Sequence, residues 1–138
     1  PYVWWVKEPI DLARMQAAAA AFVGRHDFRA FSDDDPEEKS TVVVLDEVTV
    51  AATGALVLVR VAGSHFLWKM VRRMVGVLVA VGTGALPPSR VAEWLDDPRR
   101  ARGEPARLTA PAAGLFLERV FYEGDTWPEP LIAPIPVR

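Results

Sequence analysis

The longest apolar segment of the chain, residues 63–79, is interrupted by three cations. At 100° per residue, Lys69, Arg72 and Arg73 follow helical spacing and share one narrow face with Gly76. Apolar side chains fill the other faces, and residues 74–81 are apolar all round, which is typical of a buried helix. The pattern therefore predicts a helix over residues 64–82 that begins with a basic stripe and ends inside the core.

Two interpretations fit this basic stripe. Lysine and arginine can bury their stems in a core helix and extend their charges to water. Alternatively, the three cations point at an anionic group. A membrane span is not expected, because the apolar part falls well short of the ~20 residues that a bilayer requires, and Gly82 and Gly84 end it.

Shorter patterns predict the other elements. Asp11 is a good N-cap for an alanine-rich helix with one apolar side, and Gly24 is its natural stop. A second short helix starts at residues 87–89 and ends near residue 97, and residues 32–38 form an acidic, exposed loop. Strands are predicted over residues 1–6, 41–50, 55–61 and 115–122, with a hairpin turn at residues 51–54.

The order of these elements predicts an α+β fold. Strand, helix, two strands, a helix pair and a strand make the split β-α-β-β-α-β arrangement, as in ferredoxin-like and RNP-like folds. Four antiparallel strands would then carry helices on one face, and the other face would be open to a partner sheet or a ligand. We expect the domain to span residues 1–122, followed by a proline-rich tail over residues 123–138.

Composition narrows the functional classes. A chain of 138 residues that is 51% hydrophobic and 25% charged is typical of one globular domain. The absence of cysteine excludes disulfides, thiolate metal sites and cysteine nucleophiles, and fits the cytoplasm. A net charge of −2 argues against a basic surface overall but leaves room for a local basic patch. Because the chain begins at Pro1 without an initiator methionine, we expect a piece of a longer polypeptide or a processed one.

Motifs for independent chemistry are weak. His26 and Asp27 are adjacent, which rarely aims two side chains at one proton, so we expect Asp27 to bond local backbone while Phe28 and Phe31 anchor the core. Two histidines without cysteine make a metal cluster improbable, and no glycine-rich phosphate loop occurs. His65 could cap the long helix or reach a phosphate. The arginines over residues 99–107 alternate with carboxylates, which fits a self-compensated loop better than an RNA contact.

Three segments, taken in order, resemble the C-terminal half of tRNA pseudouridine synthase A. They span most of residues 1–122, and the tail lies outside the resemblance. The segments are Gly24-Arg25-His26-Asp27-Phe28 with Phe31, then residues 66–76 with Val81-Gly82, then Thr109-Ala110-Pro111 with Gly114-Leu115, Val120 and Tyr122.

This resemblance implies an isomerase of RNA that needs no cofactor and no metal. Enzymes of this family flip a uridine out of the anticodon stem-loop, detach its base and rejoin the base to the ribose through carbon. The essential aspartate and a base-stacking tyrosine belong to the N-terminal half, and this chain has no motif that matches the aspartate. The implied partners are tRNA, the N-terminal half of the enzyme and a second copy in a homodimer.

The resemblance also implies roles for single residues. Arg72 matches the basic residue that pairs with the catalytic aspartate, and an adjacent guanidinium would keep that carboxylate ionised in a closed pocket. Lys69, Arg73 and His65 are expected to contact RNA phosphates or the other half, and Leu117, beside Arg119 on the last strand, is expected to touch the base. The remaining motif residues are expected to be structural: His26, Asp27, Phe28, Gly76, Thr109 and Pro111.

One departure from the family and one rival function stay open. Where the family carries an Arg-Thr-Ile run, this chain reads Lys39-Ser40-Thr41-Val42, so an arginine contact there would pass to Lys39 or be absent. The rival is a catalytically inactive RNA-binding or dimerisation module with the same fold, in which Arg72 pairs with a structural carboxylate.

Overall fold

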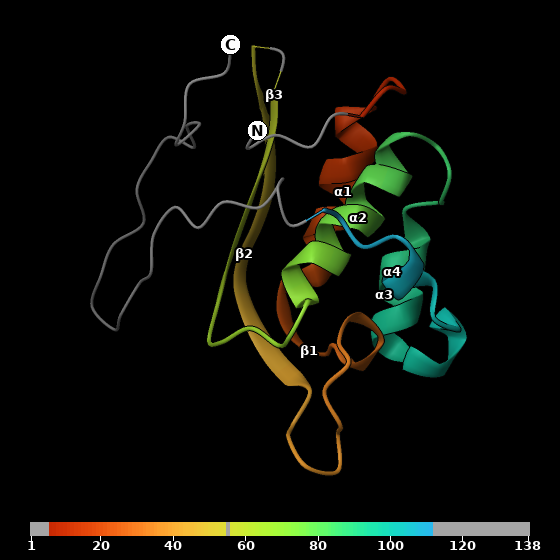
Figure 1. The fold of residues 1–138 in the computed structure, drawn as a ribbon. Helices are drawn as coiled ribbons and strands as arrows, with labels where there is room; N and C mark the ends of the chain where they lie inside the picture. Colours follow the sequence, from red (N-terminus) through yellow and green to blue (C-terminus); the bar gives the residue numbers. More distant parts are fainter. Residues whose placement is uncertain (1–5, 55, 112–138) are drawn as a thin grey trace, which may run out of the picture.

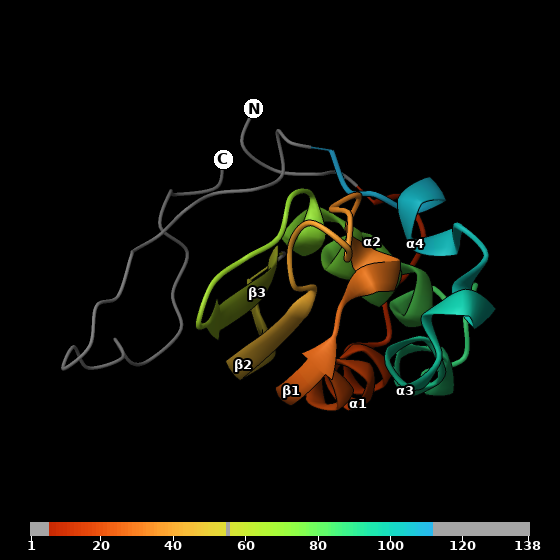
Figure 2. The same ribbon diagram turned by 90° about the horizontal axis from the view of Figure 1, so that it is seen from below.

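In the computed structural model, which describes residues 6–54 and 56–111, helices cover one face of an antiparallel sheet (Figures 1 and 2). The sheet has the order β1-β2-β3. The elements in chain order are α1 (Leu12–Phe22), β1 (Gly24–Asp27), the 3-10 turn η1 (Arg29–Phe31), β2 (Val42–Thr53), β3 (Leu56–Gly63), α2 (Met70–Gly82), α3 (Ser89–Asp96), the 3-10 turn η2 (Pro98–Ala101) and α4 (Glu104–Arg107).

The long strand β2 buries odd-numbered residues in its first half and even-numbered residues in its second half. Val43 and Leu45 are buried in its first part, and Val48 and Val50 are buried in its second. The spacing shifts from odd to even positions at a bulge opposite the end of β3. Because side chains alternate across a strand, one extra residue is needed to keep both apolar pairs on the helix side.

The predicted hairpin is confirmed, with longer strands and a shorter turn. Thr53 pairs with Leu56, so the reversal is confined to the residues around Gly54, whose φ of +59° suits glycine. Val57, Val59 and Val61 pack against the core from the inner face of β3. The four-residue strand β1, which pairs with residues 42–45 of β2, was not expected from the sequence.

The α+β class and the antiparallel sheet are confirmed within the described residues. These residues form a sheet of three strands where four were predicted. The predicted strand over residues 1–6 lies outside the described part except for Val6, which is not in a strand. The predicted last strand over residues 115–122, which includes Leu117, and the tail over residues 123–138 lie outside it altogether.

Helix α1 forms as its caps predict. The Asp11 carboxylate accepts a hydrogen bond from the Arg14 backbone N–H at 3.2 Å, and Gly24 follows the helix with a φ of +105°. Met15, Ala18, Ala19 and Phe22 are buried on one face, where α1 packs against β2, α2 and α3. The small alanine side chains let these neighbours approach closely.

Polar contacts join the start of α1 to the end of α2. The Asp11 backbone N–H donates to the Gly82 carbonyl at 2.8 Å, and Arg14 Nε donates to the Val81 carbonyl at 3.1 Å. The Val81 carbonyl also accepts from the Gly84 backbone N–H at 3.1 Å, so Arg14 adds a second donor at the helix end and places a cation where the helix dipole is negative. This junction sets the direction of α2 across the core.

The structure of the segment after α2 agrees in part with the helix and loop that the sequence predicted there. Helix α3 buries Val91, Trp94 and Leu95, the three residues that the sequence placed inward. The arginine-rich connection that follows is not an extended loop, because it contains the short turns of η2 and α4. Helix α4 brings the chain back to α2, so that residues 108–110 cross it.

Candidate functional site

Helix α2 begins later than predicted. Its first residue is Met70, and residues 64–69 form a loop in place of the expected first turns. Lys69 has a φ of +63°, in the left-handed region that non-glycine residues rarely adopt, and this residue ends the loop. The prediction of a helix from residue 64 was therefore wrong, and Lys69 does not belong to a continuous helical stripe.

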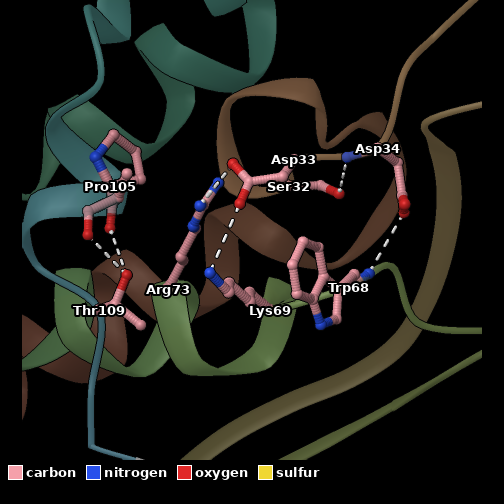
Figure 3. A network of polar contacts seen from close by, with 9 residues as sticks. Ser32, Asp33, Asp34, Trp68, Lys69, Arg73, Pro105 and Thr109 are labelled. Atoms are coloured by element: carbon pink, nitrogen blue, oxygen red, sulfur yellow. Dashed lines mark hydrogen bonds and ion pairs between the residues drawn. The ribbon is translucent and has the colours of Figure 1, made fainter.

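Arg73 is buried, with 5% of its surface exposed. Its Nη2 donates to Asp33 Oδ1 at 2.7 Å, and Lys69 Nζ lies 3.7 Å from Asp33 Oδ2 (Figure 3). The hydrogen bond from Arg73, with the positive charges of Arg73 and Lys69, holds the pKa of Asp33 below its usual value of 3.8. The acidic loop is thereby fixed to the start of α2.

Asp34 makes a second link between the same two segments. Its Oδ2 accepts from the Trp68 backbone N–H at 3.2 Å, and its own N–H donates to Ser32 Oγ at 2.9 Å (Figure 3). The backbone hydrogen bond from Trp68 is the main cause that lowers the pKa of Asp34. Lys39 Nζ lies 3.6 Å from the same carboxylate.

Arg72 is held by a different segment, residues 108–110, which we call the strap. Arg72 Nε donates to the Ala110 carbonyl at 2.8 Å, and the Ala110 N–H donates to the Arg72 carbonyl at 2.9 Å. Among the described residues, no acceptor contacts the terminal Nη1 and Nη2 atoms of Arg72. A guanidinium held through Nε in this way presents its other two nitrogens as a fork.

Gly76 allows the strap to lie this close. A Cβ atom built on Gly76 would be 1.6 Å from the Leu108 carbonyl oxygen and 3.1 Å from the Ala110 nitrogen. Any side chain there would collide with backbone. Thr109 steadies the strap by donating from Oγ1 to the Ala106 carbonyl at 2.7 Å. The same hydroxyl lies 3.4 Å from the Pro105 carbonyl (Figure 3).

The other predicted site residues lie apart from Arg72. His65 is exposed, and its Nδ1 lies 3.1 Å from Ser64 Oγ. His26 contacts the Val23 carbonyl through Nε2 at 2.8 Å and packs edge-on against Phe28, which is fully buried. Asp27 Oδ1 accepts from the Arg29 backbone N–H at 3.0 Å and from Thr41 Oγ1 at 2.6 Å. Pro111 is exposed at the end of the described part.

Comparison with known proteins settles the family. A sequence profile of the family described as tRNA pseudouridine synthase matches residues 18–123. The chain belongs to this family.

Individual relatives agree. The chain is similar to tRNA pseudouridine synthase A of Pelobacter propionicus, with 46% identity over 121 residues, which cover 88% of this chain and 48% of that protein. The enzyme of the same name from Myxococcus xanthus is 45% identical over 120 residues, covering 86% of this chain and 44% of the relative. That of Pseudothermotoga lettingae is 38% identical over 120 residues, covering 86% and 48%. The resemblance noted in the sequence is confirmed, and the chain spans about half the length of these relatives.

Sequence reasoning missed three residues that shape this synthase-family site. Asp33 and Asp34 looked like members of a solvated acidic loop, and Trp68 looked like one apolar position among many. The sequence signal that could have identified the two aspartates was the run of acidic residues. Cations at the start of a buried helix require counterions when they are themselves buried. Only the fold shows which acids approach which cations.

The arginines over residues 99–107 form a separate, largely self-compensated surface in this family member. Arg99 Nε lies 3.1 Å from Asp97, Arg100 Nε lies 3.8 Å from the same carboxylate, and Arg107 Nη2 lies 3.7 Å from Glu104. This surface borders a shallow cleft lined by residues of α3, η2 and α4. The contacts fit the interpretation of a solvated connection.

Neither a metal site nor a membrane-spanning helix is found within residues 6–54 and 56–111. No group of three or more histidine, aspartate or glutamate side chains lies placed to hold a metal ion. No helix there has both the length and the apolar character needed to cross a membrane.

Proposed function

We propose that this chain is the C-terminal half of a tRNA pseudouridine synthase that converts uridine to pseudouridine in the anticodon stem-loop. The glycosidic bond of the target uridine breaks, the base rotates, and a bond from ring carbon to the ribose replaces it. Substrate and product are isomers, so the reaction requires no cofactor. Family membership supports the reaction class. We place the catalytic aspartate on the N-terminal half, so this chain alone is expected to be inactive.

The environment of the Arg72 guanidinium is the observation that supports the proposed role of this half. The strap engages its Nε and leaves the Nη fork without an acceptor among the described residues. A planar fork of this kind matches the two oxygens of a carboxylate. We assign the fork to the catalytic aspartate of the other half. There it would hold the pKa of that aspartate low while the flipped base excludes water from the pocket.

The RNA contacts proposed for this half are fewer than the basic stripe suggested. Lys69 and His65 stay proposed as phosphate contacts because both reach the surface of the loop before α2. Arg73 is not proposed as one, because it is buried and paired with Asp33. Leu117 stays proposed as a contact of the uracil ring. The complete enzyme is proposed to act on tRNA as a cytoplasmic homodimer.

The decisive experiment uses the full-length protein with both halves. We expect Arg72→Ala to lower tritium release from labelled tRNA by at least about 100-fold, because a charge-assisted contact of about 3 kcal/mol at the reacting carboxylate is lost. Arg72→Gln should also move the acidic limb of the pH–rate profile to higher pH. Without the guanidinium the aspartate binds its proton more tightly, and the carboxylate forms only at higher pH.

Arg25→Ala is the matched control, since Arg25 is an exposed arginine on β1, away from α2. Its turnover and its thermal unfolding should match those of the parent enzyme. Parent-like turnover in Arg72→Ala would refute the assignment of Arg72. If the unmodified full-length enzyme binds tRNA but releases no tritium, the rival function as an inactive RNA-binding module replaces the proposal.

A further inference from the structure

The loop before α2 exposes two aromatic rings around a buried leucine. Phe66 and Trp68 are 43% and 62% exposed, whereas Leu67 between them is 4% exposed. Leu67 thus anchors the loop in the core and directs both neighbours outward. Trp68 is the most exposed of the large apolar residues in the described part of the chain. Two exposed rings on one short loop make a candidate contact surface, because large aromatic side chains are enriched where proteins meet their partners.

The Trp68 backbone is anchored to Asp34, and a cation lies over one face of the ring. The Trp68 backbone N–H is bonded to Asp34, and the Lys69 ammonium lies 4.5 Å from the ring centroid (Figure 3). Lys69 itself is kept at a φ of +63°, a strained conformation that persists where surrounding contacts enforce it. A backbone anchored in this way loses little conformational entropy when a ligand stacks on the ring.

The charges around the ring favour an anionic partner. Lys69 and Arg73 share the single carboxylate of Asp33, and Asp34 is matched by Lys39. Within these ion pairs three cations face two carboxylates, which leaves one positive charge in excess at Asp33, beside Lys69. The remaining carboxylates of the acidic loop, Asp35, Glu37 and Glu38, form no ion pair with these three cations. Figure 1 shows the rest of the acidic loop, in orange, extending away from α2.

A protein partner fits these charges less well than a nucleotide does. A protein interface that buried Trp68 would also remove the Lys69 ammonium from water, and the partner would have to supply a carboxylate for it. A nucleotide can contact both groups, because its base can stack on the indole ring and its phosphate can approach the ammonium. Flipping a uridine also leaves neighbouring bases unstacked, and this cost must be offset by contacts of this kind.

We propose that Trp68 and Lys69 form a stacking platform for an unpaired nucleotide of the RNA substrate, other than the uridine that reacts. Phe66, on the same outer side of the loop, extends the platform. The identity of the RNA as tRNA rests on the proposed function, but the platform itself rests on the exposure and charge of this loop.

The test measures binding of a synthetic tRNA anticodon stem-loop to the full-length protein, with no readout of turnover. We expect Trp68→Ala to weaken binding by about tenfold to hundredfold, the range found when one stacked base loses its aromatic partner. Trp68→Phe should keep most of the affinity. Trp68→Ala should leave the salt dependence of binding unchanged, whereas Lys69→Ala should lower the salt slope by about one. Val44→Ala, at an exposed apolar position on β2, is the control.

The possible outcomes separate the platform from the proposed function. Parent-like RNA affinity in Trp68→Ala would overturn the platform. A lowered unfolding temperature with unchanged RNA affinity would also overturn it, and would assign the ring to a contact with the other half of the protein. Loss of RNA affinity in Trp68→Ala, in an enzyme that releases no tritium, would support the platform while refuting the synthase activity.

Discussion

Replacing Gly76 with alanine tests how the strap holds Arg72. The new Cβ would lie 1.6 Å from the Leu108 oxygen, and real Cβ atoms essentially never approach closer than 3.0 Å. The strap must therefore withdraw by about 1.4 Å, since helix α2 is buried and has no room to move the other way. A withdrawal of this size would break the two hydrogen bonds of 2.8 and 2.9 Å between Arg72 and Ala110.

The expected cost follows from these contacts. Two lost hydrogen bonds destabilise by about 1 kcal/mol each, and overpacking adds about 1–3 kcal/mol. The higher helix propensity of alanine returns about 1 kcal/mol. We therefore expect the free energy of unfolding to fall by about 2–4 kcal/mol, measured by urea denaturation of the full-length protein. At temperatures where the variant is folded, its turnover should fall as Arg72 loses its support.

Gly82→Ala is the matched control in the same helix. Its Cβ would meet Met15 Cγ at 2.7 Å and Ile10 Cγ2 at 2.9 Å, and these are side-chain atoms that can rotate away. Gly82 is the last residue of α2, where alanine gains less helix propensity than in the helix interior at Gly76. A lower stability of Gly76→Ala than of Gly82→Ala therefore cannot come from propensity and reports the backbone collision. Equal stability of the two variants would refute the reasoning, because Gly76 would then have no special role beside the strap.

Two further predictions concern the acidic groups near the helix ends. Because Arg73 holds the folded-state pKa of Asp33 below the unfolded value of 3.8, this pair stabilises the fold above that pH, and the stabilisation disappears as pH falls through the lowered value. Asp33→Asn should thus lower the free energy of unfolding by about 1 kcal/mol at neutral pH, a modest figure because Asp33 is half-exposed. The denaturation curves of variant and parent should converge in acid. A gap of constant size at every pH for Asp33→Asn would contradict the ion-pair explanation. Asp11→Ala should cost about 1 kcal/mol by urea denaturation, because the N-cap bond to Arg14 is lost; an unchanged midpoint would show that the cap is dispensable.

Several elements could be predicted because their causes are close in sequence. The helix between Asp11 and Gly24 is defined by its own caps, and the hairpin by a turn between two β-rich runs. Helix α3 shows its buried face in the spacing of Val91, Trp94 and Leu95. The short strand β1 escaped prediction because four residues carry no readable alternation, and its strand geometry comes from pairing with β2.

The start of α2 shows where periodicity along the sequence fails to predict the structure. Helical periodicity continued through residues 64–69, yet Asp34 holds the Trp68 backbone across 34 residues of sequence, and Lys69 adopts a left-handed conformation. No periodic pattern carries that information, because the carboxylate that satisfies the loop comes from another segment.

The sequence by itself determined the family, the α+β class, and most helices and strands. Through the family resemblance it also indicated Arg72, whose pairing with a catalytic carboxylate stays a proposal. Only the tertiary structure decided that the adjacent cations Arg72 and Arg73 have different surroundings. Arg73 meets Asp33 across 40 residues and is buried, whereas Arg72 meets Ala110 across 38 residues and keeps its Nη fork free of described acceptors. The reason is physical, since neighbouring helical residues point about 100° apart and each meets whatever segment the fold brings to its side.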